Sequence, residues 1–238
     1  MSVSLRCYST SLGCPKNRVD TERLLGSLGV ALVPVESPDE AELVFINTCA
    51  FIQPATEESV RTIAQAIADI EELPKRPLLA VAGCLVGRYH AEDLAPELPE
   101  VDLWLDNSDL EAWPAMLARK LGLPEPTVPG RILSTGPSYA WLKISDGCRH
   151  ACSFCAIPNI RGGHRSHCKD MIVCEARALL DQGVKELNLV AQDLTEWGCD
   201  LDGKQDLRTL LDGLLPLQGL ERLRLMYLYP AGMTHEML

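Results

Sequence analysis

The stretch Cys148-Arg149-His150-Ala151-Cys152-Ser153-Phe154-Cys155 brings three cysteines close together in the sequence. Three thiolates at this spacing can hold one inorganic centre and leave part of it uncovered. A cubane iron-sulfur cluster takes one cysteine per iron, so three cysteines leave one iron open to another ligand. A structural zinc site is the alternative, but such sites usually have four ligands in two pairs, and His150 lies between the cysteines rather than at a second-pair spacing. The pattern therefore favours an iron-sulfur cluster with a catalytic role.

The composition around this stretch is that of a globular protein. The chain has 238 residues, of which 47% are hydrophobic and 23% charged, a balance that predicts one or two domains with a real core. Residues 1–16 lack the basic and apolar segments of a leader, and the longest apolar run, residues 78–87, is too short to span a bilayer. We therefore expect a cytoplasmic protein without a membrane partner. Its ten cysteines are then expected to be reduced and available for metal or redox use.

The formal net charge of −11 is distributed unevenly along the chain. Residues 1–130 hold 10 Lys and Arg against 20 Asp and Glu, whereas residues 131–238 hold 12 against 13. Nucleic-acid binding relies on clustered basic side chains that neutralise phosphates, and no such stripe is present, so direct nucleic-acid binding is not expected. The acidic half would suit a basic protein partner. An acidic surface that serves only solubility is the alternative.

Short apolar runs alternate with helical patterns in the first half of the chain. This alternation predicts an α/β domain, an open parallel sheet covered by helices on both faces. The predicted strands are residues 5–9, 31–35, 43–47, 78–82 and 101–105, and the predicted helices are residues 19–28, 56–72, 89–95 and 110–121. Prolines and glycines then interrupt both patterns from residue 121 to residue 137. We therefore predict a first domain at residues 1–123 and a linker at residues 124–137.

Three cysteines of this first domain each follow a predicted strand. Cys14 follows the first strand, Cys49 the third and Cys84 the fourth. The carboxyl ends of parallel strands share one edge of an open sheet, where ligands collect, so the three thiols are expected to converge. Taken singly, each could be an ordinary buried thiol. Their equivalent positions favour a second cluster site.

Residues 138–238 read as the beginning of a second parallel unit. Strands are predicted at residues 140–145, 186–190 and 222–227, and helices at residues 170–182 and 207–215, with a further helix beginning at residues 234–238. The tri-cysteine stretch then lies at the carboxyl end of the first strand, where barrel enzymes carry their chemistry. A full eight-fold barrel needs about 250 residues, so these residues hold only about three βα units. We expect an incomplete barrel.

The motifs resemble those of a known family. The CxxxCxxC spacing with Phe154, followed by Ala156-Ile157-Pro158 and Arg161-Gly162-Gly163-His164-Arg165-Ser166, is similar to the signature of the radical S-adenosylmethionine (SAM) methylthiotransferases. The residues around Cys14, Cys49 and Cys84 look like the three cysteine motifs of the N-terminal domain of that family. The resemblance covers essentially the whole chain. It implies a radical SAM partial barrel that is truncated here, without the small C-terminal TRAM domain of the family.

The same resemblance implies the cofactors. These are SAM and two 4Fe-4S clusters, one held by Cys148, Cys152 and Cys155 and an auxiliary one held by Cys14, Cys49 and Cys84. The candidate SAM contacts are Phe154, Gln192 and Asp193; a plain polar loop cap is the alternative for the last two. Leu194 and Trp197 stand where the family usually has a hydroxyl residue and a tyrosine. The remaining cysteines match no cluster motif and are read as ordinary thiols: Cys7, Cys168, Cys174 and Cys199.

Within the family, the sequence is most similar to the branch that methylthiolates the β-carbon of an aspartate in a small-subunit ribosomal protein at the decoding centre. Pro15-Lys16 and Tyr227-Leu228-Tyr229-Pro230 favour this basic protein substrate. The alternative is the sister branch, which methylthiolates an adenosine in transfer RNA. A further alternative is a non-catalytic iron-sulfur fragment. An electron donor, not identified by the sequence, is also implied, and we expect residues 1–238 alone to be inactive.

Overall fold

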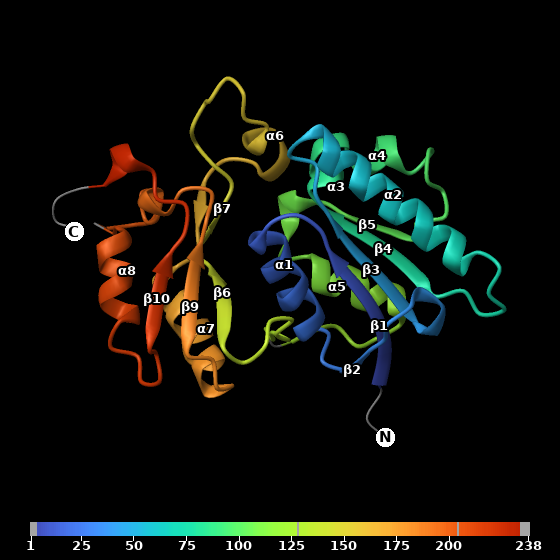
Figure 1. The fold of residues 1–238 in the computed structure, drawn as a ribbon, viewed down its shortest axis with the longest axis horizontal. Coiled ribbons are helices and arrows are strands. Elements are labelled where there is room, and N and C mark those ends of the chain that lie inside the picture. Colours follow the sequence, from blue (N-terminus) through green and yellow to red (C-terminus); the bar gives the residue numbers. More distant parts are fainter. Residues whose placement is uncertain (1–3, 128, 204, 234–238) are drawn as a thin grey trace. The chain divides into compact units, whose positions relative to one another are not determined.

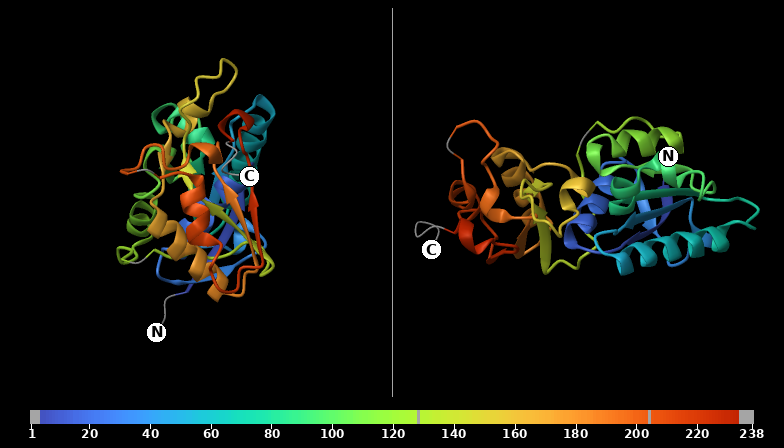
Figure 2. Two further views of the ribbon diagram at one scale, coloured as in Figure 1. Left: turned by 90° about the vertical axis from the view of Figure 1, so that its left-hand side faces the viewer. Right: turned by 90° about the horizontal axis from the view of Figure 1, so that it is seen from above.

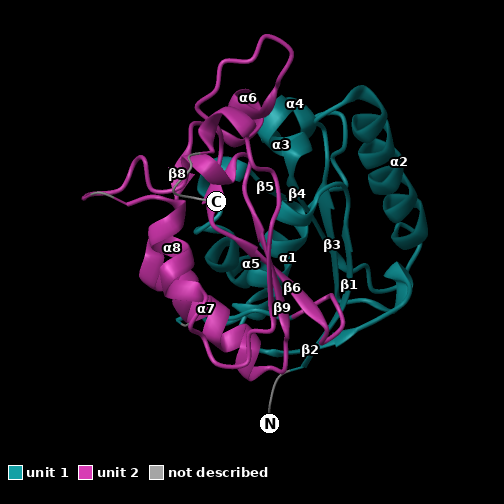
Figure 3. Cartoon of the chain, turned by 60° about the vertical axis from the view of Figure 1, so that its left-hand side comes forward, with its two compact units in different colours: residues 1–132 teal, residues 133–238 magenta. Residues whose placement is uncertain are grey.

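The computed structural model describes residues 4–127, 129–203 and 205–233, and the helix predicted at residues 234–238 lies outside this range. The chain divides into two compact units, Met1–Ile132 and Leu133–Leu238 (Figure 3). Their boundary falls within the range predicted as a linker. In the described part of the chain, no helix combines the length and the apolar character needed to cross a membrane.

Unit 1 is built on a five-stranded parallel sheet, which confirms the predicted α/β class (Figure 1). Its strands are β1 (Ser4–Ser11), β2 (Ala31–Pro34), β3 (Leu43–Thr48), β4 (Leu78–Gly83) and β5 (Leu103–Leu105), in the order β2-β1-β3-β4-β5. Every residue of β3 is buried, as expected for a central parallel strand covered on both faces. The strand order reverses between β1 and β3, and such a switch point is where ligands bind in open α/β sheets.

Helices cover both faces of this sheet. They are α1 (Pro15–Gly26), α2 (Gln53–Ile70), α3 (Cys84–Tyr89), α4 (Ala91–Leu94) and α5 (Trp113–Leu121). Leu24 of α1 and Leu117 of α5 share one core with Phe45 of β3. The single helix predicted at residues 89–95 is wrong. Two short helices meet at His90, whose φ of 60° is incompatible with a continuing helix, and the first of them already begins at Cys84.

The end of the segment predicted as a linker is fastened to α1. The backbone N–H of Ile132 donates to the carbonyl of Glu22 (3.1 Å), and Gly130 donates to Oγ of Ser27 (3.1 Å). Between them, Nη2 of Arg131 lies 2.7 Å from Oε2 of Glu22, and both side chains are buried. Residues 130–132 are therefore part of unit 1.

Unit 2 contains a three-stranded parallel sheet in the order β10-β9-β6. Its strands are β6 (Tyr139–Lys143), β9 (Glu186–Val190) and β10 (Arg222–Leu225), and its longer helices are α7 (Lys169–Asp181) and α8 (Leu207–Leu214). The two helices lie on one side of the strands (Figure 2, left), where their apolar faces form a core with Leu142, Leu189 and Trp197. The three predicted strands and two predicted helices are therefore present.

A small antiparallel pair not foreseen in the sequence closes the tri-cysteine stretch. The strand predicted at residues 140–145 ends at Lys143 and is followed by β7 (Ser145–Asp146), which pairs with β8 (Arg165–Ser166). Between β7 and β8 lie the three cysteines and the short helix α6 (Ile157–Arg161), which was also not predicted. The cysteine stretch is therefore a loop with a closed base at the carboxyl end of β6.

Candidate functional site

The three cysteines of unit 1 meet at the carboxyl edge of its sheet. Cys14 is the N-cap residue of α1 after β1, Cys49 follows β3, and Cys84 opens α3 directly after β4. A hydrogen bond with the Cys84 side chain and burial raise the pKa of the Cys49 thiol, with a smaller contribution from Cys14. The expected convergence of the three thiols is therefore present in the structure, since β1, β3 and β4 are neighbours.

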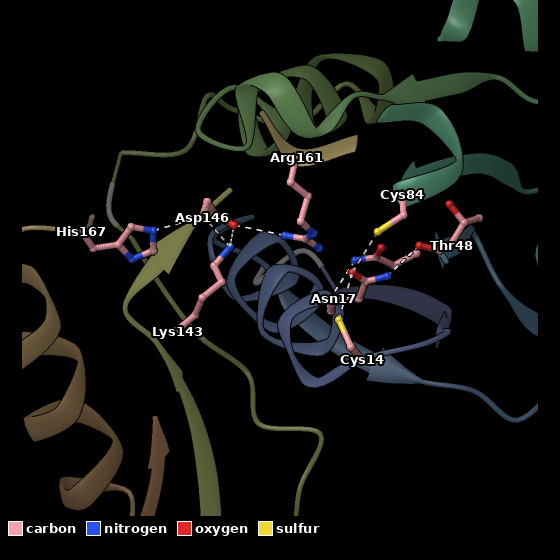
Figure 4. A network of polar contacts seen from close by, with 9 residues as sticks. Cys14, Asn17, Thr48, Cys84, Lys143, Asp146, Arg161 and His167 are labelled. Carbon is pink, nitrogen blue, oxygen red and sulfur yellow. Dashed lines mark hydrogen bonds and ion pairs between the residues drawn. The ribbon is translucent and has the colours of Figure 1, made fainter. Parts of the chain in front are cut away.

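Asn17, in the first turn of α1, links two of these thiols (Figure 4). Its Oδ1 accepts from Sγ of Cys14 (3.9 Å) and from Sγ of Cys84 (3.7 Å). Its Nδ2 donates to the carbonyls of Leu12 (3.1 Å) and Thr48 (2.6 Å). Because both amide protons are taken by backbone carbonyls, Oδ1 must face the cysteines.

Two glycines allow the strand ends to approach this closely. At Gly13, with a φ of +80°, a Cβ atom would lie 2.6 Å from Cβ of Cys49. At Gly83, with a φ of +97°, a Cβ atom would lie 2.2 Å from Oδ1 of Asn47. Any larger residue would push the neighbouring strand end away. Packing therefore requires glycine directly before Cys14 and directly before Cys84.

The tri-cysteine loop of unit 2 is partly ordered by its own backbone. The N–H of Cys148 donates to the carbonyl of Gly162 (3.2 Å), and that of Cys155 donates to the carbonyl of Cys152 (3.0 Å). Burial raises the pKa of the Cys148 thiol, and Cys155 and Cys152 add to this effect. Phe154 is 86% exposed. The loop therefore presents three neighbouring thiols and one uncovered aromatic ring.

A buried charge network supports the base of this loop (Figure 4). Asp146, two residues before Cys148, lies 2.8 Å from Nζ of Lys143, 3.1 Å from Nη1 of Arg161 and 3.2 Å from Nε2 of His167. Burial acts to raise the pKa of Asp146, but the Lys143 ammonium, the hydrogen bond with His167 and the Arg161 guanidinium together hold it well below its usual range. A lysine in an apolar strand was the one sequence signal of this network.

Asp193, a predicted SAM contact, reaches the tri-cysteine loop through His150. Nε2 of His150 lies 2.9 Å from Oδ2 of Asp193, while Oδ1 accepts from the N–H (2.9 Å) and Oγ1 (2.7 Å) of Thr195. Burial acts to raise the pKa of Asp193, but the hydrogen bonds with Thr195 and His150 lower it overall. Gln192, beside it, is half-buried. The carboxylate therefore anchors the loop; contact of either residue with SAM stays a prediction.

Two residues of the loop after β9 belong to the core of unit 2. Leu194 and Trp197 are 0% and 1% exposed. Nε1 of Trp197 donates to the carbonyl of His167 (3.0 Å). Both side chains therefore pack the loop against unit 2.

The two cysteine sets suit a polynuclear centre in their donor chemistry and spacing. A single tetrahedral Zn²⁺, with Zn–S distances of about 2.3 Å, holds thiolates about 3.8 Å apart. Among the described residues, ligand atoms of three or more His, Cys, Asp or Glu side chains lie within 4.8 Å of one another at two places, and neither is a cysteine triplet. Sulfur donors that are gathered but more widely spread fit an iron-sulfur cluster better than one zinc ion.

The chain resembles curated proteins over almost its whole length. Residues 6–106 match the family described as "Uncharacterized protein family UPF0004". A protein of Nitratidesulfovibrio vulgaris (strain DP4) named ribosomal protein uS12 methylthiotransferase RimO is 68% identical over 97% of this chain and 54% of its own length. A protein of the same name from Lawsonia intracellularis is 59% identical over 100% of this chain and 54% of its own length. Another from Aquifex aeolicus is 47% identical over 96% of this chain and 50% of its own length. The chain spans about half the length of these relatives.

Solved structures support the fold. The radical SAM methyltransferase TsrM from Kitasatospora setae matches with a TM-score of 0.64 at 13% identity, over 100% of this chain and 56% of that one. The cobalamin-dependent SAM radical enzyme OxsB matches with a TM-score of 0.52 at 13% identity, over 90% and 37%. At such identities the likeness concerns the fold alone. Over about half of their length, the chain is similar to relatives named ribosomal protein uS12 methylthiotransferase RimO.

Proposed function

We propose that the protein is a radical SAM methylthiotransferase that replaces a hydrogen on the β-carbon of an aspartate in a small-subunit ribosomal protein with a methylthio group. One observation carries the proposal. Two separate sets of three cysteines gather at the carboxyl ends of two parallel sheets, in a chain 68% identical to a relative named for this reaction. A radical reaction suits the substrate, because a base at neutral pH cannot abstract a hydrogen from that carbon.

In this proposal each cysteine set holds one 4Fe-4S cluster. Cys148, Cys152 and Cys155 bind one cluster and leave one iron open for SAM, and Cys14, Cys49 and Cys84 bind the second. The clusters and SAM supply the electron and the radical chemistry, which the chain only positions and shields. Phe154, Gln192 and Asp193 are the proposed SAM contacts.

Three polar side chains near the two cysteine sets have distinct roles. Before a cluster binds, Asn17 holds the Cys14 and Cys84 thiols close together, because its Oδ1 atom accepts a hydrogen bond from each of them. Lys143 and Arg161 pair with the buried Asp146 carboxylate and so hold the base of the tri-cysteine loop in place. Preorganised loops matter here because radical chemistry tolerates little misplacement and requires that water be excluded.

The surface charge supports a basic protein substrate. The excess of acidic residues is concentrated in residues 1–130, with 20 Asp and Glu against 10 Lys and Arg. Electrostatic complementarity would raise the association rate with a basic ribosomal protein. An electron donor is also required, and nothing in the chain identifies it. We place the reaction in the cytoplasm, where ribosomes are found.

The test uses the full-length protein, reconstituted anaerobically with iron and sulfide and supplied with SAM and dithionite. Mass spectrometry of the ribosomal protein should show one CH3S group in place of one hydrogen, a gain of about 46 Da. The variant Cys148→Ala/Cys152→Ala/Cys155→Ala should lose this activity and retain about four of about eight irons. The matched control Cys168→Ala/Cys174→Ala, which removes two exposed thiols of the same unit, should retain both.

The outcomes separate the alternatives. Faster modification of transfer RNA than of the ribosomal protein would replace the proposed substrate with an adenosine. Full iron content without SAM cleavage would instead indicate a non-catalytic iron-sulfur protein. Unchanged iron in the triple-alanine variant would show that the ligand assignment is wrong.

A further inference from the structure

Three side chains outside both cysteine sets come together in unit 2. His164 lies directly before β8, whereas Cys199 and Asp200 lie in the middle of the loop between β9 and α8. One ligand atom from each of the three lies within 4.8 Å of the other two. The sequence alone indicated no role for them, and Cys199 was expected to be an ordinary thiol.

Backbone and side-chain contacts hold this cluster in place. Oδ2 of Asp200 accepts from the N–H of Ser166 (2.9 Å), and its Oδ1 lies 3.5 Å from Nε2 of His164. Oγ of Ser166 lies 3.0 Å from the same nitrogen and accepts from the N–H of Gly198 (2.9 Å). The His164 side chain is only 4% exposed, so its ring has little freedom to turn away. Two of the three donor groups are therefore preorganised.

The donor types point to one class of ion. Imidazole, thiolate and carboxylate are the three ligand types of protein-bound Zn²⁺, whereas Ca²⁺ and Mg²⁺ take oxygen ligands. Two ligands at about 2.0 Å from a tetrahedral ion lie about 3.3 Å apart, close to the 3.5 Å between His164 and Asp200. Cys199 and Asp200 are exposed, which leaves a solvent-facing fourth position for water.

We propose that His164, Cys199 and Asp200 bind one Zn²⁺ ion, with a water molecule as the fourth ligand. On binding, Nε2 of His164 exchanges its hydrogen bond with Oγ of Ser166 for a bond to Zn²⁺. The Cys199 sulfur forms a Zn–S bond, and its thiol proton passes to solvent. No electron is transferred.

This site would tie together two segments that flank the tri-cysteine loop. His164 leads into β8, which closes the base of that loop. The loop carrying Cys199 and Asp200, residues 191–206, includes Asp193, which is already joined to the tri-cysteine loop through His150. Zinc would thus fix the middle of a loop that the protein itself fixes near its start. The proposal concerns an ion with one open, water-bound position and does not depend on the proposed reaction.

The first test measures alkylation of individual thiols by mass spectrometry in the cluster-loaded protein, with and without ZnCl2. Zn²⁺ should slow the modification of Cys199 by a factor of 1 + [Zn²⁺]/Kd, roughly tenfold when free Zn²⁺ is about ten times Kd. Cys168 and Cys174, exposed thiols of the same unit, are internal controls whose rates should not change. Equal protection of all three thiols, or no protection of Cys199, would overturn the proposal.

The second test uses Co²⁺ as a spectroscopic probe of the same cluster-loaded protein. One equivalent should produce the charge-transfer band of a single cobalt–thiolate bond and the visible bands of a tetrahedral site. Cys199→Ser, a change at an exposed position, should abolish the charge-transfer band, whereas Cys174→Ser should keep it. His164→Gln should weaken binding while circular dichroism stays unchanged. A band that survives Cys199→Ser would refute the assignment.

Discussion

Replacing Gly83 with alanine should damage the auxiliary cysteine site. Gly83 has a φ of 97° and a ψ of −153°, a region that is essentially restricted to glycine and costs other residues about 1–3 kcal/mol. A Cβ there would also lie 2.2 Å from Oδ1 of Asn47 and 2.6 Å from the carbonyl of Thr48. Asn47 cannot move aside, because it is fully buried and its Nδ2 donates to Asn17 (2.8 Å) and Thr21 (3.0 Å).

The expected magnitude is the sum of strain and overlap. Overpacking of a tight core costs about 1–3 kcal/mol, so Gly83→Ala should destabilise unit 1 by about 2–6 kcal/mol. The matched control is Gly122→Ala: Gly122 also has a positive φ, of 69°, but a Cβ there meets no atom within 4 Å. The control should cost only about 1–2 kcal/mol, for the left-handed backbone conformation.

The assay is hydrogen–deuterium exchange of the iron-free, reduced protein, followed in peptides that cover β4. Exchange of this central strand reports the opening of unit 1 separately from unit 2. Iron content after reconstitution is the second measurement, and Gly83→Ala should lose about four irons while the control keeps about eight. If exchange of β4 is no faster in Gly83→Ala than in Gly122→Ala, the close packing around Asn47 does not contribute the expected ~1–3 kcal/mol to the loss of stability.

Two further predictions concern stability. Arg131→Met removes the buried guanidinium that pairs with the Glu22 carboxylate, so the free energy of unfolding of unit 1 in urea should fall by about 3–5 kcal/mol. The double variant Glu22→Gln/Arg131→Met should recover most of this loss, and additive losses would contradict the pairing. Asp206 caps α8 by accepting from the N–H (2.8 Å) and Oγ1 (2.7 Å) of Thr209, so Asp206→Ala should cost about 1 kcal/mol at neutral pH. These hydrogen bonds lower the pKa of Asp206, so the capping contribution is present above its unfolded pKa of about 3.9 and is lost as the pH falls through the lower folded value. The difference between the two proteins should therefore shrink in acid, and a constant difference would show that the carboxylate charge is not involved.

The sequence alone determined the order of the main helices and strands, and the edge of the sheet at which the candidate ligand cysteines lie. Apolar runs reflect burial, and burial follows local periodicity, so β3 and β9 could be located without a structure. The carboxyl ends of parallel strands share one edge by topology. That rule was sufficient to bring Cys14, Cys49 and Cys84 together, although they are far apart in the chain.

The shortest helices and strands could not be predicted from the sequence. The helix α3 begins at Cys84 itself, α6 has five residues, and β7 and β8 have two residues each. None is long enough to show a period of 3.6 or 2 residues, and their positions follow from the positive φ at Gly83 and from the pairing across the tri-cysteine loop.

The side-chain partners were decided by tertiary structure alone. Asn17 contacts Cys84, 67 positions away, and His150 contacts Asp193, 43 positions away. His164 and Asp200 meet across a similar separation to form the proposed zinc site. Local sequence patterns record how deeply a residue is buried, but they do not record which distant side chain it faces. That information exists only once the strands and loops are packed, because a contact distance is a property of two segments together.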